Sequence, residues 1–303
     1  MIKNIFCIFL LALGTRTAVA DTMNANKTST ETDKLSLNIG IFYANSDSNI
    51  AVTNSKTGGT FPLDFEDDLL LAKKLYLPYF ELAYSFNQRH NLYIEWKSLH
   101  RNAETNTVTH DFILEDIDDK DYLIESGAQL STELNIDILR LGYGYDIWQG
   151  TDYVVGASLG LHTMFIKAGF KGTIGICVPD STVTSLCNNV IATPEVVDES
   201  LTAPLPDIGL YGSYEFYSGW IFNAHAQYLA INYDDVNGSL IDVRLGIDTK
   251  INDNWSLKLA YNYYDVDVTI EKTRNIGEFE HKTYDHNISY SFTGPMFALS
   301  YVF

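Results

Sequence analysis

Residues 295–303, Pro-Met-Phe-Ala-Leu-Ser-Tyr-Val-Phe, close the sequence and decide its fold class. Successive side chains of an extended strand point to opposite faces, and one face here carries large apolar groups: Phe297, Leu299, Tyr301 and Phe303. The other face carries smaller groups. Because the other strand-like segments alternate in the same way, this pattern indicates an antiparallel transmembrane β-barrel of a bacterial outer membrane. The alternative is an edge strand of a soluble sandwich.

The N-terminus has the pattern of a secretory signal peptide. Lys3 precedes a short apolar run, and residues 18–20 read Ala-Val-Ala before Asp21, as at a cleavage site. Cys7 lies inside the run, so a lipoprotein anchor is not expected, and no later segment offers about 18 consecutive apolar residues for a helical span. We therefore expect a signal peptide at 1–20, a periplasmic N-terminal segment at 21–34 and a barrel at 35–303.

Composition agrees with this class. Aromatic residues make up 13% of the chain, and 20 Tyr suit the boundary between membrane and water. The mean hydropathy is only −0.06, because each lipid-facing apolar residue of a barrel strand is followed by a polar one. The net charge of −19 becomes −21 when Lys3 and Arg16 leave with the signal peptide. This acidity argues against nucleic acid as a partner.

Ten segments show the alternation of membrane-spanning strands, and an even number returns both termini to the periplasm. They are residues 35–45, 79–86, 91–100, 139–145, 153–161, 208–216, 220–228, 241–247, 255–263 and 295–303. Each outward face is apolar for about five positions, close to the 9–11 residues that a tilted strand needs to cross. Ten strands are expected, and eight or twelve are the alternatives because residues 111–125 could pair with residues 130–138 as an extension beyond the membrane.

The fourth segment contains a change of phase. The apolar side chains change faces along this segment: those of Leu134, Ile136 and Ile138 lie on one face of the strand, and those of Leu139 and Leu141 lie on the other. This change predicts either a β-bulge near Ile138 and Leu139 or a strand that continues beyond the membrane as part of a longer hairpin.

The connections fall into two classes, which gives the orientation. Those around residues 87–90, 146–152, 217–219 and 252–254 are short, whereas those around 46–76, 101–130, 166–204 and 265–288 are long. Short turns of such barrels face the periplasm and long loops face outward.

The lumen-facing positions carry charges of both signs, which could link opposite walls. They are Glu81, Glu95, Lys97, Arg140, His162, Asp207, Glu215, His225, Asp242, Arg244, Asp248, Lys250 and Lys258. Three interpretations stay open: a polar core that fills the lumen, a thin aqueous path lined by charges, and a catalytic group among them.

Acidic clusters and two cysteines mark the predicted outer loops. Residues 64–68 and 115–121 are densely acidic, but neither has the glycine and the spaced final Glu of a calcium loop, so no metal site and no cofactor are predicted. Cys177 and Cys187 lie in one loop of an exported chain, which predicts a disulfide.

The chain resembles a group of proteobacterial outer-membrane β-barrel proteins, small monomeric barrels of the porin-like superfamily with no agreed activity. The resemblance spans most of residues 35–303 and rests on motifs at strand ends and turns: Phe-Glu-Asp-Asp-Leu at 65–69, Ala-Pro-Leu-Pro at 203–206, Tyr-Asp-Asp at 233–235, Gly-Ser-Leu at 238–240, Tyr-Asn-Tyr-Tyr at 261–264 and the closing strand. It implies that Phe297, Leu299, Tyr301 and Phe303 form a signal for the barrel-assembly machinery. It also implies a monomer surrounded by outer-membrane lipid and lipopolysaccharide.

Enzymatic patterns of outer-membrane barrels are weakly matched. Omptin proteases, which are also ten-stranded, place an acidic pair and an Asp/His pair near the outer rim. The acidic pairs nearest a strand top here are Asp234 with Asp235 and Asp265 with Asp267, and the nearby histidines are His281 and His286. Lipid A deacylases carry a His and a Ser two residues apart on one strand face, and this pattern is absent here. A hydrolase needs a nucleophile beside a base. An enzyme is therefore not expected.

We expect a structural or surface-interaction role, such as anchoring, adhesion or envelope integrity. A low-conductance channel for small solutes is the alternative, and an omptin-like or lipid-modifying enzyme is third.

Overall fold

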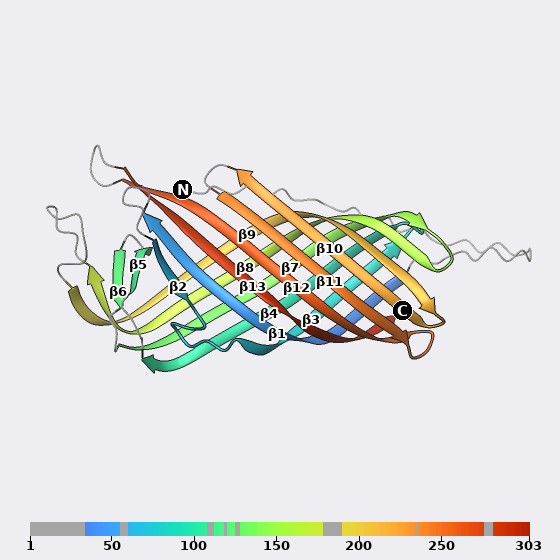
Figure 1. The fold of residues 1–303 in the computed structure, drawn as a ribbon, viewed down its shortest axis with the longest axis horizontal. Coiled ribbons are helices and arrows are strands. Elements are labelled where there is room, and N and C mark those ends of the chain that lie inside the picture. Colours follow the sequence, from blue (N-terminus) through green and yellow to red (C-terminus); the bar gives the residue numbers. More distant parts are fainter. Residues whose placement is uncertain are drawn as a thin grey trace, which may run out of the picture. The chain divides into compact units, whose positions relative to one another are not determined.

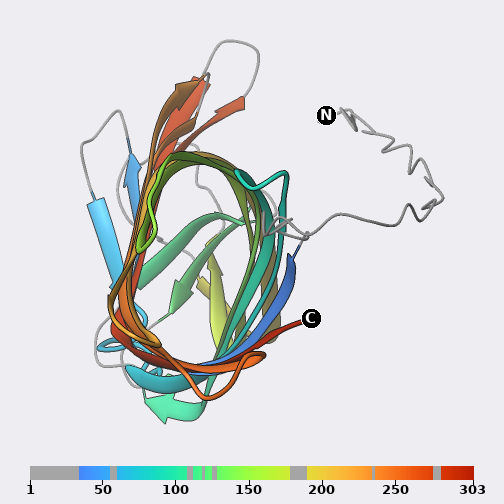
Figure 2. The same cartoon turned by 90° about the vertical axis from the view of Figure 1, so that its right-hand side faces the viewer.

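Ten long strands close into one antiparallel barrel in the computed structural model (Figures 1 and 2). The structure describes residues 34–54, 60–107, 112–117, 120–124, 128–177, 190–233, 236–275 and 281–303. The signal peptide and almost all of the N-terminal segment predicted at 1–34 lie outside these ranges. Around the barrel the order is β1-β3-β4-β7-β8-β9-β10-β11-β12-β13, and β13 pairs with β1. No described helix is long and apolar enough to cross a membrane.

The barrel strands differ in length because several of them continue beyond the membrane. Their bounds are β1 Lys34–Asn54, β3 Lys74–Phe86, β4 His90–Thr107, β7 Gln129–Gln149, β8 Tyr153–Cys177, β9 Val190–Tyr217, β10 Trp220–Tyr233, β11 Val236–Lys250, β12 Trp255–Asn275 and β13 His281–Val302. Each of the ten predicted segments lies within one of these strands, apart from the last residue of the chain. The predicted fold class and strand number are confirmed.

Three short strands stand outside the closed sheet. β2 (Thr60–Asp64) pairs with β1, and β5 (Phe112–Ile117) forms a hairpin with β6 (Lys120–Ile124). β6 then pairs with the end of β8 through residues 121–123. Residues 112–117 and 120–124 therefore do form strands outside the wall, but the predicted pairing of 111–125 with 130–138 is wrong. β5 and β6 pair with each other and β6 with β8, whereas residues 130–138 of β7 pair with β4 and β8.

The terminal strand closes the barrel as its alternation predicted. Leu37 pairs with Tyr301 and Ile39 with Leu299, and the Phe303 amide donates to the Leu35 carbonyl at 2.9 Å. Large apolar side chains face outward from all ten strands and form one apolar band around the barrel. Because hydrocarbon cannot satisfy backbone groups, closure of the sheet is what allows this band to lie in a membrane.

The phase change in β7 is an inversion of polarity and not a bulge. Ile138 pairs with Met164 and Leu139 with Thr163 without any register shift, so the predicted bulge near Ile138 and Leu139 is wrong and the alternative, a longer strand, is right. The register shift in β7 lies at Asp146 and Trp148 instead. Inward positions are polar in the membrane and apolar beyond it, and outward positions change in the opposite sense.

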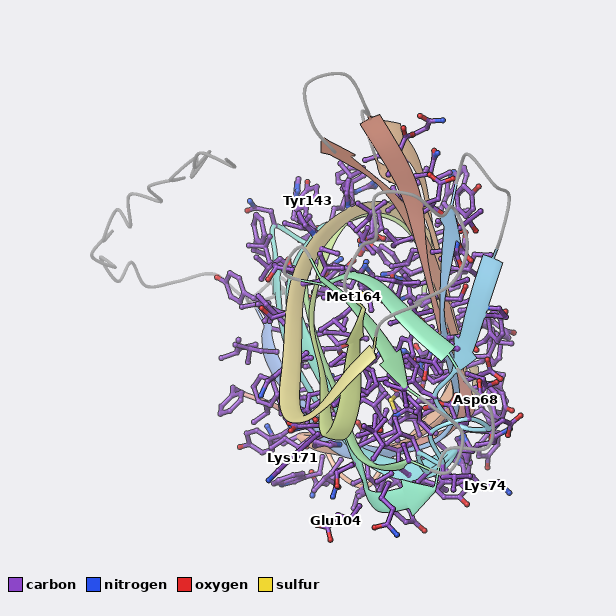
Figure 3. The ribbon with its side chains drawn as sticks, turned by 90° about the vertical axis from the view of Figure 1, so that its left-hand side faces the viewer. Asp68, Lys74, Glu104, Tyr143, Met164 and Lys171 are labelled. Carbon is purple, nitrogen blue, oxygen red and sulfur yellow. The ribbon has the colours of Figure 1, made fainter. Side chains whose placement is uncertain are left out.

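Beyond the apolar band the strands form what we call the extracellular extension. It comprises residues 45–54 of β1, 98–107 of β4, 129–138 of β7, 163–177 of β8, 264–275 of β12 and 281–294 of β13. Its interior is a compact apolar core that includes Leu134, Ile136, Met164, Val266 and Tyr290. Figure 3 looks into this end, where Met164 lies within the ring and Lys171, Lys74 and Glu104 lie at its margin. Burial in this core raises the pKa of the Tyr290 hydroxyl.

Candidate functional site

A layer of acidic, basic and histidine side chains crosses the lumen within the membrane, and we call it the ion layer. Its members project inward from β4, β7, β8, β9 and β11, because inward positions recur every second residue along each strand. They are Glu95, Lys97, Arg140, His162, Asp207, Asp242 and Arg244. All except Arg244 are at most 3% exposed.

One half of the ion layer is centred on Asp207. The Arg140 Nη2 donates to Asp207 Oδ1 at 3.1 Å, and His162 Nδ1 lies 3.0 Å from Asp207 Oδ2. A carboxylate only accepts, so Nδ1 is the protonated nitrogen of this histidine. Arg140 also lies over the Tyr93 ring at 4.4 Å and donates to its hydroxyl at 2.6 Å.

The second half is built around Lys97 and Asp242. The Lys97 Nζ lies 2.7 Å from Glu95 Oε1 and 3.5 Å from Asp242 Oδ2, and it donates to Asn262 Oδ1 at 3.3 Å. Asn262 in turn donates to Asp242 Oδ1 at 2.6 Å. These contacts join β4 to β11 and β12 across the lumen. His162 Nε2 lies 3.9 Å from Asp242 and has no hydrogen-bond partner among the described residues.

Arg244 ties the layer to β3. Its guanidinium donates to Glu95 and, at 2.8 Å, to the Tyr79 hydroxyl, which donates to Glu81 at 2.7 Å. Asn38 adds a hydrogen bond to Glu81 at 2.6 Å. Burying an ion costs several kcal/mol unless opposite charges and hydrogen bonds compensate. The density of contacts is therefore what allows these charges to remain in the lumen.

Glycines on the inner face of β7 and β8 give the layer its space. A Cβ at Gly142 would lie 2.1 Å from the Tyr93 ring, and a Cβ at Gly160 would lie 2.4 Å from Asp207 Oδ2. The side chains of the layer therefore lie directly against the backbone of this wall. A larger residue at either position would push Tyr93 or Asp207 out of contact with Arg140.

A second closure lies on the extracellular side, where residues 64–71 fold into the barrel as a plug segment. Phe65, Leu69 and Leu71 are each at most 3% exposed. Glu66 accepts hydrogen bonds from the Ser48 amide at 2.9 Å, from the Ser48 hydroxyl at 2.8 Å and from Arg101. Arg101 also donates to Ser48 at 2.7 Å. The plug segment is thus held to β1 and β4 by a buried ion pair.

The acidic cluster at 64–68 shapes this plug segment. Asp64 Oδ1 accepts from the amides of Glu66 at 2.8 Å and Asp67 at 2.7 Å, and Asp68 Oδ2 accepts from the Asp64 amide at 2.8 Å. These carboxylates cap their own turn. In the part of the chain that the structure describes, no three His, Cys, Asp or Glu gather as metal ligands. The side chains at 115–121 lie outside the described residues.

The remaining predicted lumen residues lie nearer the periplasmic end. Asp248 and Lys258 face each other at 3.8 Å, and His225 lies 3.0 Å from Gln227. Glu215 and Lys250 are at the rim, 3.8 Å apart and partly exposed. The structure therefore brings most of the predicted lumen residues into one network and leaves Glu215 and Lys250 at the rim of the barrel.

Sequence reasoning missed several participants. Tyr79, Tyr93 and Asn262 occupy inward positions of predicted strands, so alternation could have found them as uncharged partners of the charged set. The inward position of Asn38 follows from the alternation of residues 35–45, but its contact with Glu81 was not predicted. The pair of Arg101 with Glu66 carried no such signal, because the plug segment has no periodicity.

The other predicted groups have separate outcomes. Phe297, Leu299 and Phe303 project outward from the closing strand, as an apolar face requires, and their part in assembly stays a prediction. Cys177 is the last residue of β8, and Cys187 lies outside the described residues, so the structure gives no support to the predicted disulfide. Asp234, Asp235 and the side chains of His281 and His286 are also outside them.

Solved structures similar to this chain are outer-membrane β-barrels. The outer-membrane protease OmpT of Escherichia coli matches with a TM-score of 0.52 and 10% identity, over 91% of this chain and 100% of that one. The toluene transporter TbuX of Ralstonia pickettii has a TM-score of 0.38 at 10% identity, over 88% and 89%. The attachment invasion locus protein Ail of Yersinia pestis has 0.30 at 10% identity, over 86% and 98%.

The likeness to OmpT supports the fold and not an activity. No family model matches the chain, and no curated protein matches it. The closed barrel, its apolar band and the likeness in fold to OmpT together define an outer-membrane β-barrel protein, located in the bacterial outer membrane.

Proposed function

We propose that this barrel has a structural role and conducts no solute: it anchors its extracellular extension in the outer membrane for contacts at the cell surface. The observation that carries the proposal is the double closure of the lumen, by the ion layer within the membrane and by the plug segment with the apolar core beyond it. The proposal includes no catalytic step.

The ion layer supports a closed lumen because its charges face one another. A conducting path for ions needs charged or polar groups that a passing ion can reach. Here Arg140 is bound by Asp207 and Tyr93, and Lys97 is bound by Glu95 and Asn262. Moving these side chains aside would leave buried charges unpaired, at a cost of about 3–5 kcal/mol for each broken pair.

The extracellular extension supports a role in presentation. Its strands pair continuously with their neighbours, as in the register from Asp47 with Ser291 to Asn54 with Tyr284. Its outer face is polar and acidic, with Asp265 and Asp267 on β12 bound to hydroxyls or amides of neighbouring residues. A rigid, hydrated wall with a packed interior holds the outer hairpins away from the lipid surface.

Single-channel recording distinguishes this role from the alternative channel. We expect the refolded mature protein to leave planar bilayers silent at high protein dose, with heat-dependent gel mobility confirming that the barrel is folded. Reproducible conductance steps that change when Arg140 or Arg244 is neutralised would replace this proposal with a low-conductance channel.

Site-specific photo-crosslinking in living cells tests the surface role directly. A crosslinker at Asp47 or His100, on the outer face of the extracellular extension, should capture protein or polysaccharide partners. The same crosslinker at Leu259, in the apolar band, is the matched control and should capture only lipid. Equal capture patterns at all three positions would contradict a surface-interaction role.

A further inference from the structure

A hollow lies on the lipid-facing side of the barrel wall, across β7, β8, β9, β10 and β11. Its volume is about 770 Å³, and no charged residue lines it. The outward side chains around it form two rows across the paired strands. The first is Tyr143, Leu159, Ile208, Tyr228 and Ile241, and the second is Tyr145, Ala157, Leu210, Ala226 and Val243.

The hollow exists because the second row alternates large and small residues. Ala157 and Ala226 flank Leu210, and tyrosines of β7 form one wall of the hollow. Tyr143 stands at the outer margin of the ring (Figure 3), where its hydroxyl lies 2.6 Å from His90 Nδ1. That contact fixes the ring, so the wall keeps its position whether or not the hollow is filled.

We propose that this hollow binds one acyl chain of a lipid from the extracellular leaflet. It is continuous with the apolar band that the membrane surrounds, so hydrocarbon is the medium that reaches it. Ile208, Tyr228 and Ile241 are the last large apolar residues before the outward positions of Pro206, Ala230 and Ser239. The hollow therefore reaches the extracellular boundary of the band at β9, β10 and β11, and it extends sideways along the wall to β7.

A second copy of the chain fits this surface less well. In a two-fold dimer the same patch lies on both subunits, so hollow would face hollow and leave an unfilled void. Voids forfeit dispersion contacts on every side. A flexible acyl chain can follow the rows and fill the space without a matching surface.

Spin-label spectroscopy of reconstituted barrels tests the proposal. The probe is phosphatidylcholine labelled midway along one acyl chain, in dimyristoylphosphatidylcholine vesicles. We expect a slowly moving component for the wild type that is lost in Ala157→Leu and in Ala226→Leu, because the added isobutyl groups occupy the hollow. Ala230→Leu, which changes an exposed residue of the same strand and face outside the hollow, should keep that component.

Heat-dependent gel mobility shows which variants are folded. The test needs only one folded variant of the two that fill the hollow, Ala157→Leu and Ala226→Leu. An immobilised component that persists in the folded filled variants would overturn the proposal. A wild-type dimer that is seen by crosslinking and abolished by Ala226→Leu would also overturn the proposal, because a second copy of the chain would then cover the hollow.

Discussion

At the scale of single residues, two neighbouring acids of the plug segment, Glu66 and Asp67, form ion pairs that differ strongly in burial. Arg101 with Glu66 is almost fully buried, whereas Lys73 with Asp67 is exposed to solvent. The hydrogen bond from Lys73 to Asp67 raises the pKa of the lysine, but water screens this pair. Both pairs join a cation to a carboxylate, and burial is the largest difference between them.

We expect Arg101→Met to destabilise the barrel by about 3–5 kcal/mol, because it leaves the Glu66 carboxylate buried without its cation. Lys73→Met is the matched control and should leave stability unchanged. Urea unfolding in lipid vesicles measures both. Adding Glu66→Leu to Arg101→Met should recover most of the loss, and equal losses for the buried and the exposed pair would contradict the argument.

Gly294 is a residue that the seam between β1 and β13 requires. A Cβ at this position would lie 2.0 Å from the Tyr43 carbonyl oxygen, a backbone atom that cannot rotate away. We expect Gly294→Ala to cost about 3 kcal/mol, the upper end of the range for ordinary substitutions, and to slow barrel closure. Folding yield into vesicles, followed by gel mobility, provides the measurement.

Gly238→Ala is the comparison for that variant, since its new Cβ would lie closest to the Ile231 methyl group, at 3.3 Å, and would meet the Asp267 carbonyl oxygen only at an ordinary contact distance of 3.7 Å. A side chain can yield by a few tenths of an ångström where a backbone carbonyl cannot. Equal yields for the two variants would show that the seam tolerates a side chain at Gly294.

At the scale of elements, the alternation along each strand predicted the wall but not its contents. Strict period two identified all ten spanning segments, because lipid on one side and a lumen on the other impose opposite polarities. The same rule placed Arg140 and Asp207 inward. Their pairing could not be predicted, since it depends on how far one strand is shifted against the next when the barrel closes.

The inversion in β7 shows why a phase change is ambiguous in a sequence. Leu134, Ile136 and Ile138 keep the inward direction of Arg140, but beyond the membrane the solvent is outside and the apolar core is inside. A bulge would give the same apparent shift. The sequence records which face is apolar, and it does not record which side of the wall is wet.

A pair of neighbouring substitutions tests the inversion. Ile136→Ala removes a side chain that is 2% exposed in the apolar core, so we expect a loss of about 2–5 kcal/mol. Asn135→Ala changes the adjacent outward residue and should stay within about 0.5 kcal/mol. Urea unfolding measures the free energy of unfolding of both variants. A larger loss for Asn135→Ala than for Ile136→Ala would mean that the strand faces the other way.

At the scale of the whole molecule, two closures lie in series along one lumen. The plug segment and the apolar core fill the extracellular extension, and the ion layer crosses the lumen within the membrane; in the proposed function these are the two closures. Closures in series are redundant, because removing one leaves the other intact. The plug segment could not be found from its sequence, since its acidic residues are typical of an exposed loop.

Cysteine accessibility separates the two closures. Met164 lines the same small cavity as Phe65 of the plug segment, and His225 lies on the periplasmic side of the ion layer. In a background with Cys177 and Cys187 replaced by Ser, we expect neither Met164→Cys nor His225→Cys to react with a membrane-impermeant maleimide added to whole cells. Replacing residues 65–71 with a Gly-Ser linker of equal length should expose Met164→Cys to the reagent, because the apolar core loses its cover. His225→Cys should stay protected in the same variant, since the ion layer still spans the lumen between it and the outside. Labelling of both cysteines after plug replacement would mean that the ion layer is permeable and that the plug segment alone closes the barrel.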